Sequence, residues 1–534
     1  MTPDTTSAAS GPPLGATSRT TPDSASRAAG AQANLYGVLA AGFPENRSAC
    51  AIEASSPDGQ PLYYTWHDIE QATGRLANLL ASFRLQPGAR IAAQVDKSPE
   101  ALLLYLACLR AGHAYLPLNS AYRQAEVDYF IGDAKPDVLV CSPANEVWMA
   151  ALAAQHNVAH LFTLGENRDG SLLTAATAQP AEFETAHVGA DQLAAVLYTS
   201  GTTGRSKGAM LTHGNLAANA LALHRIWRWR RGDVLLHALP IFHVHGLFVA
   251  AHGALLSGSR MIWLNRFDPA AVIAALPRST VFMGVPTMYV RLLDDTALSV
   301  ETCADMRLFI SGSAPLLVDT FRQFEERTGL RILERYGMSE TVMLTSNPYD
   351  GNRMAGTVGL PLPGVQVRVV DGHGDACATD EIGAIEVKGP NVFAGYWLMP
   401  QKTREEFTHD RFFKTGDIGK FDSNGYLSIV GRSKDVIISG GYNVYPREIE
   451  SYLDELPGVL ESAVVGIPDR DFGEGVAAVV VPRPDARLVP EDLIAELKAR
   501  IAGFKVPRKV LVVGELPRNQ MGKVQKNLLR DRFG

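Results

Sequence analysis

A loop rich in hydroxyl groups and glycines is the first stretch of this sequence that could do chemistry. It reads YTSGTTGRSKG over residues 198–208 and follows the apolar run LAAVL. A Walker P-loop places glycine directly before its lysine and a hydroxyl residue directly after it. Here Ser206 precedes Lys207 and Gly208 follows it. The loop is therefore not a Walker loop, but its backbone amides, hydroxyls and lysine suit the binding of a triphosphate.

Four further stretches carry groups that could act together with this loop. RYGMSET places Glu340 between two hydroxyl residues, which suits Mg²⁺, an ion that takes only one or two protein carboxylates. KTGD ends on Asp417, which could accept both hydroxyls of a ribose, while GRSKD precedes SGGYN and PRNQMGK ends on Lys523. Three of these residues also have an ordinary interpretation when taken alone: Glu340 as a helix-capping acid, Asp417 as a turn aspartate and Lys523 as a solvated lysine.

Apolar segments that alternate between helix and short strand must position these groups. The helical EALLLYLACLRAG runs into AYLPLN, and DVLLHAL, RMIWL, TVFMGV, RLFISG and RILERYG follow as strands separated by helical segments. This pattern predicts an α/β fold with largely parallel sheets, in which ligands bind at the carboxyl ends of strands. After about residue 355, short segments rich in β-branched residues and interrupted by glycine and proline predict a small β-rich subdomain.

The domain boundaries predicted from this pattern are a tail over 1–34, a large N-terminal domain over 35–432 and a smaller α+β C-terminal domain over 433–534. The tail carries almost no large apolar side chain, so we expect it to be disordered. An organellar transit peptide is the alternative, although acidic residues and prolines weaken an amphipathic helix there.

Composition narrows the class of protein further. The net charge of −6 gives no reason to expect nucleic acid as a partner, and no apolar run reaches the roughly 18 residues of a membrane span. The five cysteines are scattered without a CxxC pair, which favours a reducing compartment over a disulfide framework or a zinc site. The basic run HRIWRWRRGD is interpreted as a helix end with core tryptophans and a solvated face; contact with coenzyme A phosphates is the alternative.

Taken together and in this order, the five stretches resemble the adenylate-forming superfamily of acyl-CoA synthetases, adenylation domains and luciferases. The resemblance implies that a carboxylate attacks the α-phosphate of ATP and expels pyrophosphate, after which the thiol of coenzyme A attacks the acyl adenylate. It assigns the phosphates to Thr199, Ser200, Gly201, Thr202, Thr203, Gly204 and Lys207, the α-phosphate to Thr341, Mg²⁺ to Glu340, and the ribose to Asp417 and Arg432. It encloses the adenine with Gly312, Ser313, Ala314, Tyr336 and Gly337, and it makes Lys523 the bridge between the attacking carboxylate and the α-phosphate.

The same resemblance implies that the C-terminal domain is mobile. The catalytic groups predicted from it are Lys523, Glu340 and Thr341. Because Lys523 would stand where the thiol must enter, the family rotates this domain about a hinge in the GRxxD stretch, which falls here on Lys434. After the rotation Gly440 and Gly441 would line the channel for coenzyme A.

The acid substrate is indicated by two stretches. LPIFHVHGLF contains no acidic residue, which disfavours an amino acid substrate. VPTMYVRLL places Arg291 after the strand expected to wall the acyl pocket; its spacing alone fits equally a carboxylate partner or a solvated helix residue. This stretch and the other motifs together closely resemble those of malonyl-CoA synthetases. The resemblance implies that Arg291 binds the distal carboxylate of malonate or methylmalonate, with Ser313 and His243 nearby.

The chain is expected to be a malonyl-CoA synthetase that uses ATP, Mg²⁺ and coenzyme A, with neither nucleic acid nor membrane as partner. Two other functions remain as alternatives. A CoA ligase for medium-chain or aryl acids would instead leave Arg291 pointing to solvent, and an adenylate-forming protein that loads a carrier would not use coenzyme A. We expect a monomer or homodimer in the cytoplasm, or in an organellar matrix if the tail is a transit peptide.

Overall fold

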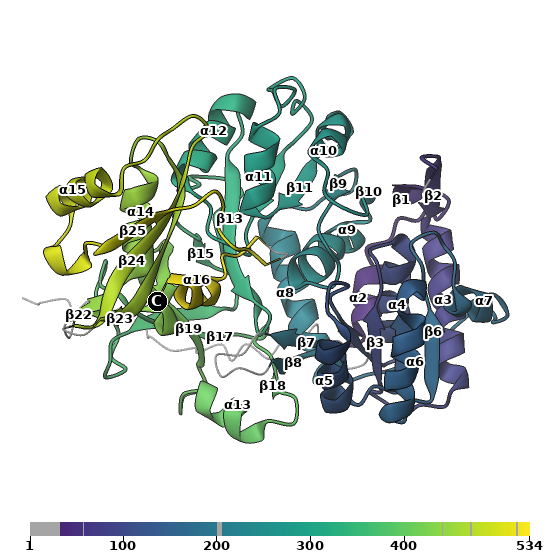
Figure 1. The fold of residues 1–534 in the computed structure, drawn as a ribbon. Coiled ribbons are helices and arrows are strands. Elements are labelled where there is room, and N and C mark those ends of the chain that lie inside the picture. Colours follow the sequence, from purple (N-terminus) through teal and green to yellow (C-terminus); the bar gives the residue numbers. More distant parts are fainter. Residues whose placement is uncertain are drawn as a thin grey trace, which may run out of the picture.

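The computed structural model describes residues 33–56, 58–199, 206–439, 442–469, 472–519 and 522–533 (Figure 1). Residues 1–32, most of the predicted tail, lie outside these ranges. The site predictions that also lie outside the described residues are those for Ser200, Gly201, Thr202, Thr203, Gly204, Gly440 and Gly441.

One large sheet has seven strands in the order β18-β8-β7-β4-β3-β5-β6. Its strands are β3 (Arg90–Gln94), β4 (Ala114–Pro117), β5 (Val138–Cys141), β6 (His160–Thr163), β7 (Leu193–Thr199), β8 (Lys207–Thr212) and β18 (Gly395–Tyr396). The strands from β3 to β7 pair in parallel, while β8 and β18 are antiparallel. The helices of this part are α2 (Leu35–Ala40), α3 (Trp66–Ser82), α4 (Pro99–Arg110), α5 (Gln124–Ala134), α6 (Glu146–Gln155) and α7 (Ser171–Thr177).

The second large sheet has nine strands in the order β15-β14-β13-β12-β11-β9-β10-β1-β2. They are β1 (Cys50–Ser55), β2 (Pro61–Thr65), β9 (Val234–His237), β10 (Arg260–Trp263), β11 (Val281–Gly284), β12 (Leu308–Ser311), β13 (Ile332–Met338), β14 (Val342–Ser346) and β15 (Leu360–Pro361). Six consecutive strands, from β13 to β1, pair in parallel; the apolar sequences of β9 to β13 predicted this, whereas β1 was not predicted. Helix α8 (His213–Ile226) contacts β7, β8 and β14 and so lies between the two sheets (Figure 1).

The remaining helices of this part continue the layered arrangement. They are α9 (His252–Ser257), α10 (Pro269–Ala275), α11 (Pro286–Leu293), α12 (Val318–Thr328) and α13 (Pro400–Glu406), with a π-helical segment at His245–Ala251. A four-stranded antiparallel sheet then follows in the order β16-β17-β19-β20, which confirms the predicted β-rich subdomain. Its strands are β16 (Gln366–Val370), β17 (Gly383–Lys388), β19 (Phe413–Phe421) and β20 (Leu427–Arg432).

The last part of the chain has its own sheet and its own two apolar layers. The strands are β21 (Ile437–Ser439), β22 (Tyr442–Val444), β23 (Val459–Asp469), β24 (Gly473–Pro482) and β25 (Lys509–Val512), and the helices are α14 (Pro446–Asp454), α15 (Pro490–Arg500) and α16 (Lys526–Phe533). Because side chains alternate along a strand, Val464 packs in one layer while Ala463 and Val465 pack in the other. The predicted fold, several sheets in a large N-terminal domain and a smaller C-terminal domain, is confirmed.

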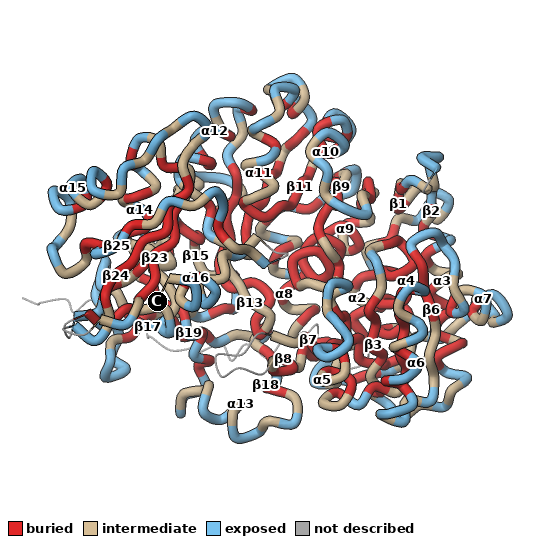
Figure 2. The backbone as a smooth tube through the Cα atoms, in the orientation of Figure 1, coloured by how far each residue is buried: buried red, intermediate tan, exposed pale blue. Residues whose placement is uncertain are grey.

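Burial follows the sheets. Figure 2 shows buried backbone concentrated along the strands of both large sheets, along α4, and along β23 and β24. None of the helices in the described ranges combines the length and apolar character needed to cross a lipid bilayer. All five cysteines are free thiols.

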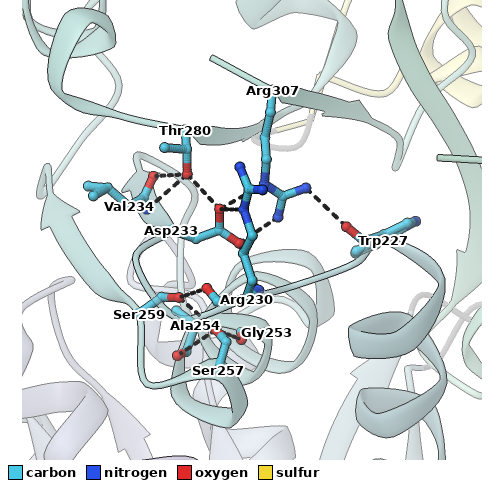
Figure 3. A network of polar contacts seen from close by, with 10 residues as sticks. All are labelled: Trp227, Arg230, Asp233, Val234, Gly253, Ala254, Ser257, Ser259, Thr280 and Arg307. Carbon is cyan, nitrogen blue, oxygen red and sulfur yellow. Dashed lines mark hydrogen bonds and ion pairs between the residues drawn. The ribbon is translucent and has the colours of Figure 1, made fainter. Parts of the chain in front are cut away.

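A buried ion pair ties the basic run HRIWRWRRGD to the nine-stranded sheet (Figure 3). The side chain of Asp233 has no exposed surface, and Arg307 donates to both of its oxygens, with Nε 2.7 Å from Oδ1 and Nη2 2.6 Å from Oδ2. Thr280 Oγ1 and the Arg230 amide donate to the same carboxylate, and Arg307 also donates to the Trp227 carbonyl. The aspartate is therefore structural, and both tryptophans of the run, Trp227 and Trp229, are buried, which confirms the interpretation of core tryptophans.

Removing the partner of this buried carboxylate is expected to destabilise the N-terminal domain. Replacing Arg307 with leucine leaves Asp233 charged and buried, which costs about 3 kcal/mol of unfolding free energy. All six tryptophans precede residue 433, so tryptophan fluorescence in urea reports on this domain. The matched control is Arg331→Leu, because Arg331 pairs with Glu325 at the surface at 2.6 Å and should contribute less than about 1 kcal/mol. Equal midpoints for the two variants would contradict the prediction.

Candidate active site

Three polar side chains from different strands meet at the predicted ribose position. Tyr336 of β13 donates its hydroxyl to Asp417 Oδ2 at 2.5 Å, and Arg432 Nε lies 2.9 Å from Asp417 Oδ1. Asp417 and Arg432 are paired across β19 and β20, so the sheet register itself brings them together. Burial and the nearby Asp417 raise the pKa of Tyr336 well above its usual value, so its hydroxyl remains a donor. The aspartate is thereby held in one orientation, with lone pairs left to accept from a ligand.

The predicted phosphate and magnesium groups also lie together. Thr199 at the end of β7 is paired in register with Lys207 at the start of β8, which closes the hydroxyl loop at its base. Thr199 Oγ1 is 3.4 Å from Glu340 Oε1, and Tyr396 donates to the same oxygen at 3.0 Å. Lys207 is only 6% exposed, and its Nζ lies 3.7 Å from Glu406 Oε1. The loop lysine and the acid of RYGMSET therefore lie near each other, both in contact with Tyr396.

Glu340 fits a magnesium ion that is shared with phosphate. It is 6% exposed, and burial raises its pKa while Tyr396, Arg432 and Lys207 oppose that rise. No group of three or more His, Cys, Asp or Glu side chains arranged to hold a metal occurs among the described residues. A single carboxylate beside a triphosphate loop suits Mg²⁺, which takes its other ligands from water and from substrate phosphates.

The turn that carries Glu340 has an unusual backbone. Val342 has a φ of 55°, an outlier for a β-branched residue, and Gly337 lies so close that a Cβ there would be 1.9 Å from the Val342 carbonyl oxygen. Such strain is typical of functional sites. Thr341 is fully buried, and its hydroxyl has no partner in the described part of the chain. Its predicted contact with the α-phosphate stays a prediction.

Arg335, which the sequence analysis did not single out, lies buried beside the predicted acyl pocket. It is 3% exposed, and its Nε and Nη2 find no hydrogen-bond partner among the described residues. Gly312 approaches it so closely that a Cβ would be 2.4 Å from the guanidinium carbon. The only signal in the sequence was a pair of charged residues, Glu334 and Arg335, inside an otherwise apolar strand.

Neutral polar groups surround this guanidinium. Burial, aided by the charge of Arg335, lowers the pKa of His243 to about 4 and that of His245 well below its usual value, so both are neutral at pH 7. Ser313 Oγ is 3.4 Å from His245 Nδ1. Burial lowers the pKa of Arg335 to about 9, so it is still a cation at pH 7. Arg335 is therefore a buried cation whose Nε and Nη2 have no hydrogen-bond partner among the described residues. The neighbouring Glu334, whose pKa burial raises to about 7, balances this charge only in part, so an anionic ligand would supply the missing partner.

Arg291 occupies a different setting. It is exposed on α11, where Thr287, one helical turn earlier, lies on the same face. Gly522 approaches Thr287 so closely that a Cβ would be 2.9 Å from its hydroxyl oxygen. The face of α11 that bears Arg291 therefore looks toward the C-terminal domain, and its predicted contact with a substrate carboxylate stays a prediction.

Lys523 is the next residue after Gly522, which approaches Thr287 of α11. Its loop closes on itself, with the Gly522 amide donating to the Asn519 carbonyl at 2.9 Å. Crowding by protein atoms, together with the charge of Arg432, lowers the pKa of Lys523 to about 8, although the residue keeps contact with solvent. Arg432 and Asp417 both act on it, so Lys523 belongs to the same site as the ribose groups. Lys434 is exposed in the connection between β20 and β21.

Comparison with known proteins agrees with this geometry. The model of the AMP-binding enzyme family matches residues 40–397, and that of the AMP-binding enzyme C-terminal domain matches residues 448–523. This chain belongs to the AMP-binding enzyme family. The resemblance inferred from the five motifs is thus confirmed, and the family match covers the hydroxyl loop, the surroundings of Arg335 and the loop that ends at Lys523.

Individual members of the AMP-binding enzyme family are similar over nearly the whole chain. ATP-bound MatB from Rhodopseudomonas palustris has 53% sequence identity and a TM-score of 0.90, covering 94% of this chain and 99% of that one. A malonate–CoA ligase of Arabidopsis thaliana is 34% identical, covering 93% of this chain and 89% of the relative. A feruloyl-CoA synthase of Amycolatopsis is 36% identical, covering 92% and 98%. The chain is an AMP-forming acid–CoA ligase.

Proposed function

We propose that the protein is an ATP-dependent malonate–CoA ligase that forms malonyl-CoA, AMP and pyrophosphate. Arg335 carries the proposal, because a buried guanidinium with free donors beside neutral histidines suits the second carboxylate of a small diacid. The similarity to a malonate–CoA ligase and to MatB supports the same substrate. Methylmalonate has the same two carboxylates and is the second substrate we propose.

In the proposed first half-reaction, the protein brings together two anions. Lys207 and the hydroxyl loop hold the phosphates, Asp417 and Arg432 hold the ribose, and Arg335 holds the distal carboxylate of the acid. The proximal carboxylate then attacks the α-phosphate, and pyrophosphate leaves. Lys523 places its ammonium between the two reacting groups, where a positive charge stabilises the transition state. Mg²⁺, held by Glu340, would neutralise charge on the phosphates when bound.

In the proposed second half-reaction, the coenzyme A thiol attacks the acyl adenylate and AMP leaves. The close approach of Gly522 to Thr287 supports an arrangement in which Lys523 faces the site for adenylate formation. The C-terminal domain, residues 433–534, must then turn about Lys434 to remove Lys523 and admit the thiol. We propose Gly440 and Gly441 for the thiol channel because small residues permit close backbone approach.

The alternative substrates are disfavoured by the same arginine. An aryl or medium-chain acid, as in the feruloyl-CoA synthase relative, would bury an apolar body against an unpaired guanidinium, which costs several kcal/mol. We further propose that the protein is a monomer or homodimer. Because all five thiols are free, we propose a reducing compartment, either the cytoplasm or an organellar matrix.

A substrate panel tests the proposed function. Pyrophosphate release and thioester formation are measured with MgATP, coenzyme A and malonate, methylmalonate, succinate, acetate, octanoate or coumarate. Malonate is expected to exceed acetate in kcat/KM by at least about 100-fold, because acetate leaves the guanidinium unpaired. Octanoate or coumarate as the best substrate would contradict the diacid assignment while leaving the family reaction intact. Pyrophosphate release without any thioester would favour the carrier-loading alternative.

A further inference from the structure

Tyr396 lies where the triphosphate loop and the turn of Glu340 meet. Its hydroxyl donates to Glu340 Oε1 at 3.0 Å, and Lys207 Nζ lies 4.2 Å from the centre of its ring. It is 4% exposed. One side chain therefore contacts both the cation proposed for the phosphates and the carboxylate proposed for magnesium.

The backbone fixes this tyrosine. It is paired with Ala209 across β18 and β8, and the next amide, of Trp397, donates to the Gly208 carbonyl at 2.7 Å. The Tyr396 amide itself donates to Thr403 Oγ1 at 2.9 Å. Phe393 packs edge-on against the ring, with 4.9 Å between centres. The ring consequently has little freedom to turn away from Lys207.

The charges around Tyr396 would otherwise neutralise one another. Glu340 accepts from the hydroxyl of Tyr396 and Lys207 lies over its ring, and in the described part of the chain Lys207 pairs with Glu406, not with Glu340. Glu406 is itself held by Lys402 at 3.0 Å. Without the ring and its hydroxyl, a direct Lys207–Glu340 pair would occupy both groups that MgATP needs.

We propose that Tyr396 is a positioning residue that keeps Glu340 and Lys207 apart and oriented for MgATP. The proposal rests on the proposed function, because it takes Glu340 as the magnesium ligand and Lys207 as a phosphate ligand. The hydroxyl would act through Glu340 on the metal, and the ring would act through Lys207 on the nucleotide. The two parts of the side chain can be removed separately.

Calorimetric titration of ATP, with and without Mg²⁺ and without acid or coenzyme A, tests the proposal. In Tyr396→Phe the ring stays and the hydroxyl is lost, so the strengthening of ATP binding by Mg²⁺ is expected to fall about tenfold, while metal-free binding changes less than about twofold. In Tyr396→Leu the ring is also lost, and metal-free ATP binding is expected to weaken about fivefold as well.

Two controls separate positioning from a general loss of structure. Tyr64→Phe removes the same kind of bond, a tyrosine hydroxyl to buried Glu100 at 2.6 Å, in a part of the fold away from the nucleotide, and should leave ATP binding unchanged. In a Glu340→Gln background, the Tyr396→Phe change should have less than about a twofold effect, since its partner is gone.

The outcomes distinguish the two levels of inference. If wild-type ATP binding depends on Mg²⁺ and Tyr396→Phe behaves as wild type, the role of Tyr396 is refuted and the proposed function stands. The role of Tyr396 is also refuted if its effect persists in full without Glu340. If ATP binds the wild type equally well with and without Mg²⁺, the magnesium role of Glu340 fails, and the role of Tyr396 fails with it.

Discussion

Replacing Lys523 with alanine is expected to slow adenylate formation by about 10³-fold, because the variant removes the cation that we propose to lie between the two reacting anions. Thioester formation from supplied malonyl adenylate is expected to change less than about threefold, since Lys523 must leave the site for that step. Pyrophosphate release measures the first half-reaction, and coenzyme A consumption from the adenylate measures the second. Lys523 lies near Arg432 and Asp417, which are the groups proposed for the ribose.

The pH dependence provides a second readout for the same residue. The pKa of Lys523 is lowered to about 8, mainly by crowding and then by Arg432. Only the protonated ammonium stabilises the phosphate, so kcat/KM for adenylate formation should be constant below pH 8 and fall about tenfold per pH unit above it. This alkaline limb should be missing in Lys523→Ala. Lys509→Ala, which changes an exposed lysine of the same domain, should keep both the rate and the limb.

A large loss in both half-reactions of Lys523→Ala would contradict the assignment, since it would indicate a damaged domain. If kcat/KM of Lys523→Ala still falls above pH 8, the group that titrates is a residue other than Lys523.

The second large effect is expected at Arg335. Changing Arg335 to leucine should lower kcat/KM for malonate by about 10³-fold, because a desolvated carboxylate loses its charged partner. Acetate, which has no second carboxylate, should change less than about threefold. Initial rates of pyrophosphate release with both acids measure the selectivity. The histidines around Arg335 are neutral, so they cannot replace its charge.

Stability should move in the opposite direction to activity in this variant. A buried guanidinium with two unpaired donors destabilises the free protein, so Arg335→Leu is expected to raise the free energy of unfolding by about 1–3 kcal/mol. Urea denaturation followed by tryptophan fluorescence checks this. A variant that loses activity and stability together would make Arg335 a structural residue and would contradict the proposed role.

Arg291→Ala is the matched comparison, because the sequence analysis assigned the same carboxylate to Arg291. An exposed arginine contributes less than a buried one, so a loss of about tenfold for malonate is expected if it assists from the face of α11. No change at Arg291 beside a large change at Arg335 would place the distal carboxylate entirely within the buried recess.

The sequence by itself determined the fold class and the order of the motifs, and it is the source of the proposed nucleotide site. Apolar runs of strand length separated by helices predicted the parallel sheets because burial on both faces leaves few polar positions. The pairing of Asp417 with Tyr336 and Arg432 agrees with the ribose position expected from the motifs, since each motif stands at the end of a predicted strand or in a turn. Residues that act near their own motif were therefore predictable.

Only the tertiary structure decided which groups are buried without partners and which distant segments meet. Adjacent strand residues point to opposite faces, so the sequence could not tell whether Arg335 faced solvent, Glu334 or a ligand recess. Tyr396 and Glu406 reach Lys207 only because β18 adds to the edge of β8, a pairing that joins segments far apart in the chain. Such contacts depend on register and layer packing, which are properties of the folded chain and not of any local stretch.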